Sequence, residues 1–174
     1  MSRFAIALAA LVLSAPAGAI AQPSARHPVL ERYFTKVDAE VRSYRALLKE
    51  FDRLFREQPQ VNVDPFVETL YRLADRFEDL TSRWSDISAP RGLRVRHRGM
   101  GHAFELFSEG IRIHAAAVFT RHAEEIVAAL ARIEPRLRSA AYLQEHWAAA
   151  LWGALIRAET RVPKWLHGMA TLGP

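Results

Sequence analysis

The chain contains no cysteine among its 174 residues. This absence excludes disulfides, thiol catalysis, cysteine-based zinc or iron–sulfur sites and haem attachment through a C-x-x-C-H motif. A lipid anchor on a cysteine is excluded as well. Any chemistry that the protein performs must therefore use other side chains.

Several other signals are also missing. The sequence has no strict apolar–polar alternation, no Asn-Gly or Asp-Gly hairpin and no glycine-rich phosphate loop. It contains neither a Gly-x-Ser-x-Gly elbow nor the His-Glu-x-x-His motif of zinc proteases. After Ala21, no uncharged apolar run approaches the ~20 residues that a membrane-spanning helix needs. These absences argue against sheets, common hydrolases and an integral membrane protein.

The first 21 residues have the pattern of a secretory signal peptide. Arg3 supplies the positive start, Phe4–Leu13 an apolar run, and Ala19-Ile20-Ala21 a small-x-small cleavage site. A retained membrane anchor is the alternative, but the apolar stretch is short and Pro16 interrupts it. We expect cleavage after Ala21 and a periplasmic or secreted bacterial protein, with residues 22–174 forming one domain.

Lysine is scarce, with three residues against 21 arginines. Beyond the leader the net charge is only +4, because 23 basic residues face 19 acidic ones. So small an excess, with one short cationic run, argues against nucleic-acid binding. Arginine forms planar forks to carboxylate or phosphate, although a GC-rich genome, which encodes arginine and alanine freely, would produce the same bias.

Apolar residues recur at alternating steps of three and four, which is typical of one face of a helix. The spacing predicts helices over residues 28–57, 65–86, 91–133 and 136–161. The stripe of the first predicted helix is complete at every step: Leu30, Phe34, Val37, Val41, Tyr44, Leu48, Phe51 and Phe55. Asp64-Pro65 is a good start for the second, and Pro135 is an expected stop for the third.

These four segments predict an all-α protein, an antiparallel four-helix bundle. The third segment would be roughly 60 Å long against roughly 40 Å for the first, so we expect it to bend or break within Gly99–Gly110. A short helical turn is expected after Pro163.

The most unusual local feature is a run of cations at the start of the third segment. Arg91, Arg94, Arg96 and Arg98 crowd an end of the helix that already carries partial positive charge, and His102 follows one turn later. An anion there would gain from guanidinium forks and free backbone N–H groups. Arg91, Arg94, Arg98 and His102 are therefore candidate ligand contacts. The alternative is structural, with cross-helix ion pairs to Glu78, Asp79 and Asp86.

A second candidate surface lies in the fourth segment, where residues 147–156 carry no charge. A helix that is apolar all round is buried or faces a partner. Trp147, Trp152 and Ile156 are candidate interaction residues, and ordinary core packing is the alternative. Either surface would serve a protein partner or a second copy of the chain.

The histidines provide an enzymatic alternative. His102 and Glu105 form a His-x-x-Glu pair and Glu109 follows on the same face. Ferritin-like bundles use the reverse order, Glu-x-x-His, supplied by facing helices. A solvated stripe of ion pairs explains these residues equally well. His97 and His114 are interpreted as core or boundary histidines.

The sequence therefore favours an exported, non-enzymatic bundle that binds a partner or an anionic ligand, such as a small molecule, a lipid headgroup or lipopolysaccharide. We expect no cofactor, no metal and no catalytic residue. The alternative is a metal-dependent or hydrolytic enzyme that uses His102, Glu105 and Glu109.

Overall fold

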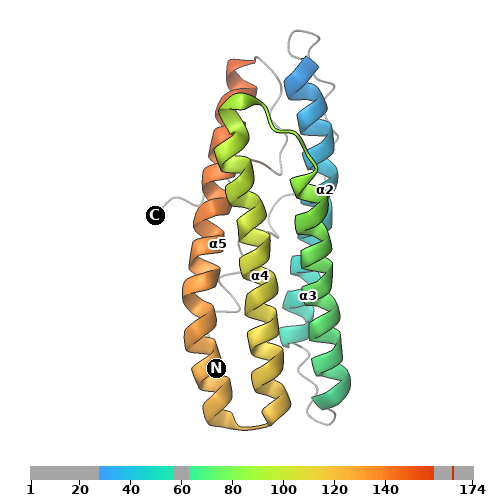
Figure 1. The fold of residues 1–174 in the computed structure, drawn as a ribbon, viewed down its shortest axis with the longest axis vertical. Coiled ribbons are helices and arrows are strands. Elements are labelled where there is room, and N and C mark those ends of the chain that lie inside the picture. Colours follow the sequence, from blue (N-terminus) through green and yellow to red (C-terminus); the bar gives the residue numbers. More distant parts are fainter. Residues whose placement is uncertain (1–27, 57–62, 159–165, 167–174) are drawn as a thin grey trace.

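The computed structural model describes residues 28–56, 63–158 and 166. These residues form α2 (Pro28–Arg56), α3 (Val63–Ser85), the short 3-10 helix η1 (Arg91–Leu93), α4 (Arg94–Thr120) and α5 (Ala123–Arg157). The four long helices lie side by side, and successive helices run in opposite directions (Figure 1). No strand occurs in the described ranges, and the predicted helical bundle is confirmed.

Two expectations concern residues outside these ranges. The predicted leader, residues 1–21, is not described. The turn expected after Pro163 is represented only by Leu166, which is helical and fully buried in the core. Among the described helices, none combines the length and apolar character required to cross a membrane.

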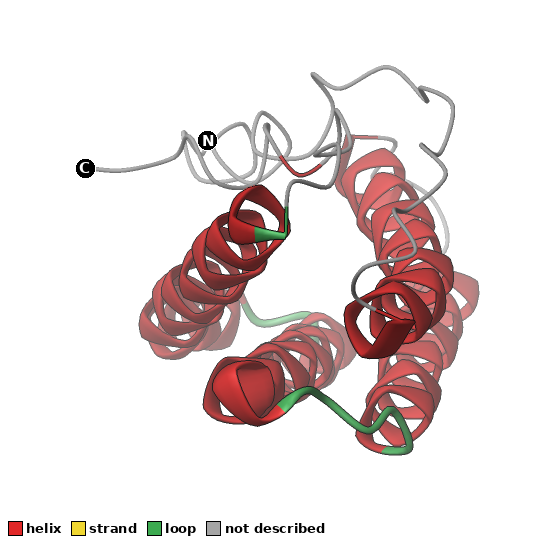
Figure 2. Ribbon diagram, turned by 90° about the horizontal axis from the view of Figure 1, so that it is seen from above, coloured by secondary structure: helices red, strands yellow, loops and turns green. Residues whose placement is uncertain are grey.

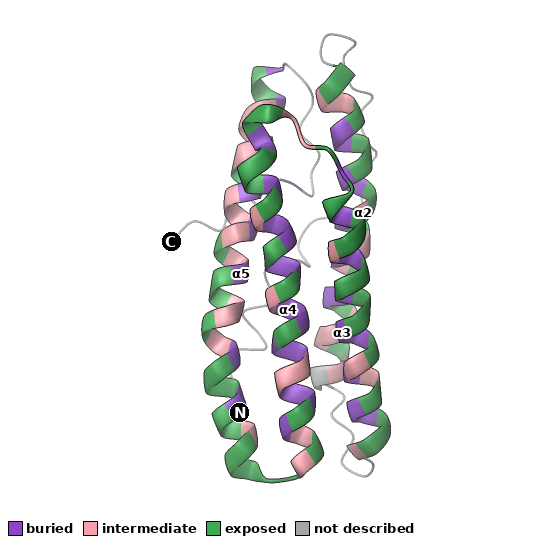
Figure 3. Ribbon diagram, viewed as in Figure 1, coloured by how far each residue is buried: buried purple, intermediate pink, exposed green. Residues whose placement is uncertain are grey.

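The apolar stripes predicted from the sequence face the centre of the bundle (Figure 3). Each spaced residue of the second stripe is buried: Phe66, Leu70, Leu73, Phe77, Leu80, Trp84 and Ile87. α4 packs closely against α3 and α5, while α2 lies beside α3 with fewer backbone approaches. Seen from above, the four helices surround one central core (Figure 2). Side chains of α2 reach α5 across this core.

The third predicted helix is wrong as a single element. α4 ends at Thr120, the chain turns through Arg121 and His122, and α5 begins at Ala123. Arg121 adopts the left-handed conformation with φ 60° and ψ 13°, and its N–H donates to the carbonyl of Val118 at 3.1 Å. The break lets α5 fold back along α4 instead of extending beyond the bundle, so both helices bury an apolar face.

The bend expected within Gly99–Gly110 does not interrupt α4. Its glycines allow neighbouring helices to approach closely instead. A Cβ at Gly101 would lie 3.2 Å from Cδ1 of Trp84, and one at Gly110 would lie 3.4 Å from Cγ2 of Ile133. These positions seat bulky side chains of α3 and α5 against the backbone of α4.

Pro135 is also wrong as a helix stop, because it lies inside α5. A proline in a helix removes the N–H that would bond the carbonyl four residues earlier, here that of Ala131. Both residues are exposed, so water reaches this carbonyl. The helix therefore continues without a buried, unsatisfied group.

We predict that Arg121→Gly stabilises the fold by about 0.5–1 kcal/mol. A left-handed conformation costs a non-glycine residue about 1–2 kcal/mol, and glycine removes this cost from the folded state. Glycine also gives the unfolded chain more conformational entropy, which cancels part of the gain in stability. The substitution also removes the exposed ion pair between Arg121 and Asp64, a contact worth little. Urea unfolding measures the change, and Asp64→Asn is the control for the ion pair. A loss of more than about 1 kcal/mol would contradict the prediction.

Candidate functional site

The cationic run predicted from the sequence lies on the surface at the start of α4. Arg91, Arg94, Arg96 and Arg98 are all exposed. Arg94, Arg98 and His102 follow one another at four-residue intervals, so they share one stripe of the helix. The neighbouring Val95 is 68% exposed. Basic and apolar surface therefore lie together at this end of the bundle.

The cross-helix ion pairs suggested for these arginines do not form. Within the described residues, none of the four lies within ion-pairing distance of a carboxylate, and Arg94 donates only a long bond of 3.4 Å to the carbonyl of Ala89. Glu78 instead accepts from Arg112 at 2.9 Å and from Ser108 at 3.0 Å. These bonds, with that from Arg112 the largest influence, lower the pKa of Glu78. The cationic cluster is therefore not neutralised by the acids of α3.

The first turn of α4 has no side chain that compensates its charge. Leu93 occupies the N-cap without a side-chain hydrogen bond, and the turn contains no acidic residue. Helix starts normally gain from caps and carboxylates, which satisfy the free N–H groups and oppose the dipole. The first turn of α4 therefore carries positive charge that its own side chains do not offset.

The structure brings together part of the His102–Glu105–Glu109 set. Nδ1 of His102 lies 2.8 Å from Oε2 of Glu105 on the exposed side of α4. Glu109 is not part of this contact, because it accepts a bond of 3.2 Å from Arg136 of α5. In the described ranges, no group of three or more His, Asp or Glu side chains converges to hold a metal ion.

The predicted apolar surface of the fourth segment is divided by burial. Trp147 is fully buried, so its assignment to an interaction surface is wrong. Trp152 is half-buried and packs against the core, while Ile156 is 56% exposed. Trp152 and Ile156 are four residues apart and share one stripe of α5, whereas Trp147 points to the opposite side of the helix. Of the three candidates, half-buried Trp152 and exposed Ile156 therefore remain accessible on one side of α5.

Trp147 belongs to a buried polar chain at the centre of the bundle. Its Nε1–H donates to the hydroxyl of Tyr33 at 3.0 Å, and this hydroxyl lies 3.0 Å from Nδ1 of His97. Nε2 of His97 lies 3.0 Å from the carbonyl of Trp84, and Nε1–H of Trp84 donates to the carbonyl of His97 at 2.8 Å. One chain of hydrogen bonds thereby connects all four long helices.

These bonds assign the proton of the imidazole. The Trp84 carbonyl can only accept, so Nε2 of His97 carries the hydrogen, and Nδ1 accepts from the Tyr33 hydroxyl. Burial lowers the pKa of His97 and raises that of Tyr33 to about 12. His97 is thus a neutral histidine, and it lies in the core, one of the two positions that the sequence allowed. His114 is also buried, which lowers its pKa.

A second buried hydrogen bond joins α2 to α5. The Tyr44 hydroxyl donates to Oε1 of Gln144 at 2.7 Å. The Tyr44 ring packs against the rings of Phe77, Phe104 and Phe107, with centroids 5.0–6.2 Å apart. These contacts hold α2 and α5 in register, and a structural role accounts for both buried bonds.

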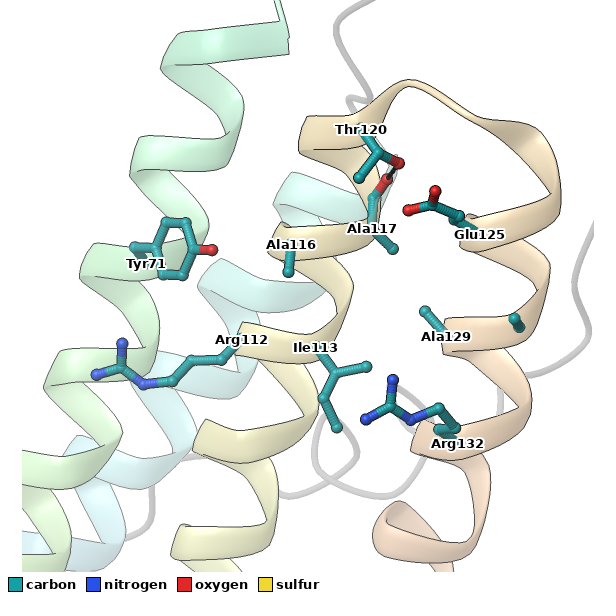
Figure 4. A pocket seen from close by; sticks show the side chains of 10 residues that line it. Tyr71, Arg112, Ile113, Ala116, Ala117, Thr120, Glu125, Ala129 and Arg132 are labelled. Atoms are coloured by element: carbon teal, nitrogen blue, oxygen red, sulfur yellow. Dashed lines mark hydrogen bonds between the residues drawn. The ribbon is translucent and has the colours of Figure 1, made fainter.

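A groove of about 560 Å³ lies at the other end of the bundle, between α3, α4 and α5 (Figure 4). The apolar part of its lining is mostly alanine, with one larger side chain: Ala116, Ala117, Ala128, Ala129 and Ile113. Glu125 and Arg132 stand at its two ends on α5 (Figure 4). The sequence predicted nothing here, because the groove exists only after α4 and α5 fold against each other.

Comparisons give this chain no relative. No protein-family model, no curated protein and no solved structure matches it. The function must therefore be argued from its own side chains.

Proposed function

We propose that this protein is an exported, non-enzymatic helical bundle that binds anionic headgroups through the start of α4. The contacts are Arg91, Arg94 and Arg98, with His102 at the edge. Export is the expectation from the leader pattern of residues 1–21 and forms part of the proposal. In that compartment, lipid phosphate and lipopolysaccharide are the abundant anions.

One observation carries the proposal: these arginines are exposed and, within the described ranges, have no carboxylate partner. Elsewhere in the bundle, arginines with a carboxylate within ion-pairing distance are common, namely Arg42, Arg72, Arg76, Arg83, Arg112, Arg121, Arg136 and Arg138. Clustered positive charge that is not offset internally costs free energy by self-repulsion and by opposing the helix dipole. Binding of an anion would offset this cost.

The cluster suits a headgroup better than a deep ligand pocket. Its side chains extend from one face of a surface helix, and exposed Val95 lies among them. Guanidinium groups form paired hydrogen bonds to phosphate oxygens, and an apolar neighbour contributes at a lipid interface. Glu105 engages Nδ1 of His102, so His102 would meet an anion only through Nε2.

The enzymatic alternative has less support. His102 and Glu105 provide two adjacent groups, but Arg136 engages Glu109. A hydrolytic or metal site would require a third converging group, and the described residues supply none there.

We predict that Arg94→Glu/Arg98→Glu abolishes binding to vesicles that contain an anionic phospholipid. Each basic residue near an anionic surface contributes about 1 kcal/mol, so loss of two arginines alone weakens binding roughly thirtyfold, and the new carboxylates add repulsion. Vesicle co-sedimentation measures this effect, and inorganic phosphate as a competitor distinguishes a free phosphate site from a membrane surface.

Lys49→Glu/Arg53→Glu is the matched control, because it makes the same charge change at exposed positions of α2. This control should bind almost as well as the parent protein. Equal losses of binding in the two double variants would show that binding depends on the net charge of the protein and not on the start of α4. Binding that survives Arg94→Glu/Arg98→Glu would refute the assigned site, and circular dichroism verifies that each variant folds.

A further inference from the structure

We propose that the groove between α4 and α5 is a homodimer interface, in which the first turns of α5 pack antiparallel against those of a second copy. This surface lies at the end of the bundle opposite the arginine cluster (Figure 1). The inference does not depend on the proposed anion binding.

The groove combines apolar surface with charges that lack partners. Ala116 of α4 and Ala128 of α5 line it and are exposed. Glu125 and Arg132 have no ion pair among the described residues. Neighbouring charged residues do have partners: Arg112 bonds to Asp75 and Glu78, and Arg136 bonds to Glu109. Glu125 and Arg132 therefore remain available to a docking chain.

Their spacing identifies the occupant. Glu125 and Arg132 are seven residues apart, which is about two turns or roughly 10.5 Å on the same side of the helix. A docking helix that complements them must place a basic residue opposite Glu125 and an acidic residue opposite Arg132, two turns away. If it runs antiparallel to α5, the acid precedes the base in its sequence, and small residues must lie between them. α5 itself has this arrangement, with Ala128 and Ala129 at the middle. The best complement of the groove is therefore the same segment of a second copy.

A two-fold axis close to Ala128 satisfies both charges at once. Glu125 of each copy then faces Arg132 of the other, and the contact closes as a symmetric dimer. Alanines at the crossing allow the two helices to approach to about 8 Å, the lower end of helix packing distances. A parallel arrangement would instead place like charges together.

The test is a charge exchange measured by sedimentation velocity over a concentration series. The parent protein is expected to dimerise. Glu125→Arg or Arg132→Glu alone converts both cross-copy contacts to repulsion and should weaken the dimer at least about tenfold. An equimolar mixture of the two variants should restore dimerisation, because the heterodimer pairs Arg with Glu at both contacts. Arg53→Glu, an exposed change on α2, should leave the dimer unchanged.

A further variant tests the same interface by steric bulk, and circular dichroism shows whether that variant is folded. Ala128→Arg introduces bulk at the axis and should also give monomers, while circular dichroism confirms helical content. A parent protein that stays monomeric up to about 100 µM would overturn the proposal, since such weak association lies outside specific interfaces. A dimer dissociation constant that none of the three substitutions changes would also overturn the proposal. So would an equimolar mixture of the two charge variants that does not dimerise.

Discussion

Trp84→Ala is expected to destabilise the bundle by about 3–5 kcal/mol, the usual cost of truncating a fully buried aromatic side chain. Trp84 is 1% exposed. Its ring stacks on His97 with centroids 4.5 Å apart, and it meets Phe104 and Trp147 edge-on at 5.3 Å. The loss is large against a typical total stability of about 5–15 kcal/mol.

The cost has a polar component as well as a packing component. Without the indole, the His97 carbonyl loses the N–H bond from Trp84. The space above Gly101 also opens, because Cδ1 of Trp84 occupies it. A cavity and a lost buried hydrogen bond therefore arise at the same place, and neither α3 nor α4 can close it without moving the other.

Urea unfolding followed by far-ultraviolet circular dichroism measures this change without relying on tryptophan emission. Phe119→Ala is the matched control, because this aromatic side chain is 63% exposed and its truncation should change stability by less than about 0.5 kcal/mol. If Trp84→Ala cost less than about 1 kcal/mol, Trp84 could not lie at the centre of the core.

The second large effect is a loss of stability as the pH falls from 7.5 to 5. His97 and His114 are each 5% exposed, and burial is the main cause that lowers the pKa of both below 6.5. Below pH 6.5 the unfolded chain takes up protons that the folded chain resists. The unfolded state then binds more protons, so stability falls with pH by up to about 1.4 kcal/mol per unit for each histidine.

Over this interval we expect a total loss of about 1–4 kcal/mol, which ends once the folded-state pKa is reached. A protonated His97 would present Nδ1–H to the Tyr33 hydroxyl, whose oxygen already accepts from Trp147. Tyr33, with its pKa near 12, stays neutral throughout and cannot balance the charge. Glu78, with a lowered pKa, contributes its own loss only below about pH 4.5, outside this interval.

Urea unfolding at several pH values tests this expectation in three proteins. His97→Gln keeps an acceptor and a donor but does not titrate, so its stability should be lower at pH 7.5 and should depend less on pH. Phe119→Ala changes an exposed side chain that has no titratable group and should follow the parent curve. Identical pH dependence in the parent and in His97→Gln would show that His97 contributes nothing to it.

Much of the fold follows from local patterns. Steps of three and four between apolar residues predicted the helices at 28–57 and 65–86, because a helix turns 100° per residue in any context. The cationic run and the His102–Glu105 pair were equally visible, since residues three or four apart meet on a helix wherever it lies. A core or boundary position for His97 was anticipated from its place near the inner stripe of the predicted third helix.

Other features depend on which helix lies across from which. The turn at Arg121 contains no glycine or proline from which it could be predicted. α5 continues through Pro135 because this part of the helix is exposed to water. Burial of Trp147, the absence of acid partners for Arg94 and Arg98 among the described residues, and the groove ending at Glu125 and Arg132 were likewise decided by packing. Periodicity specifies a face of a helix, but whether that face meets a neighbour, an ion or solvent depends on contacts between residues far apart in the chain.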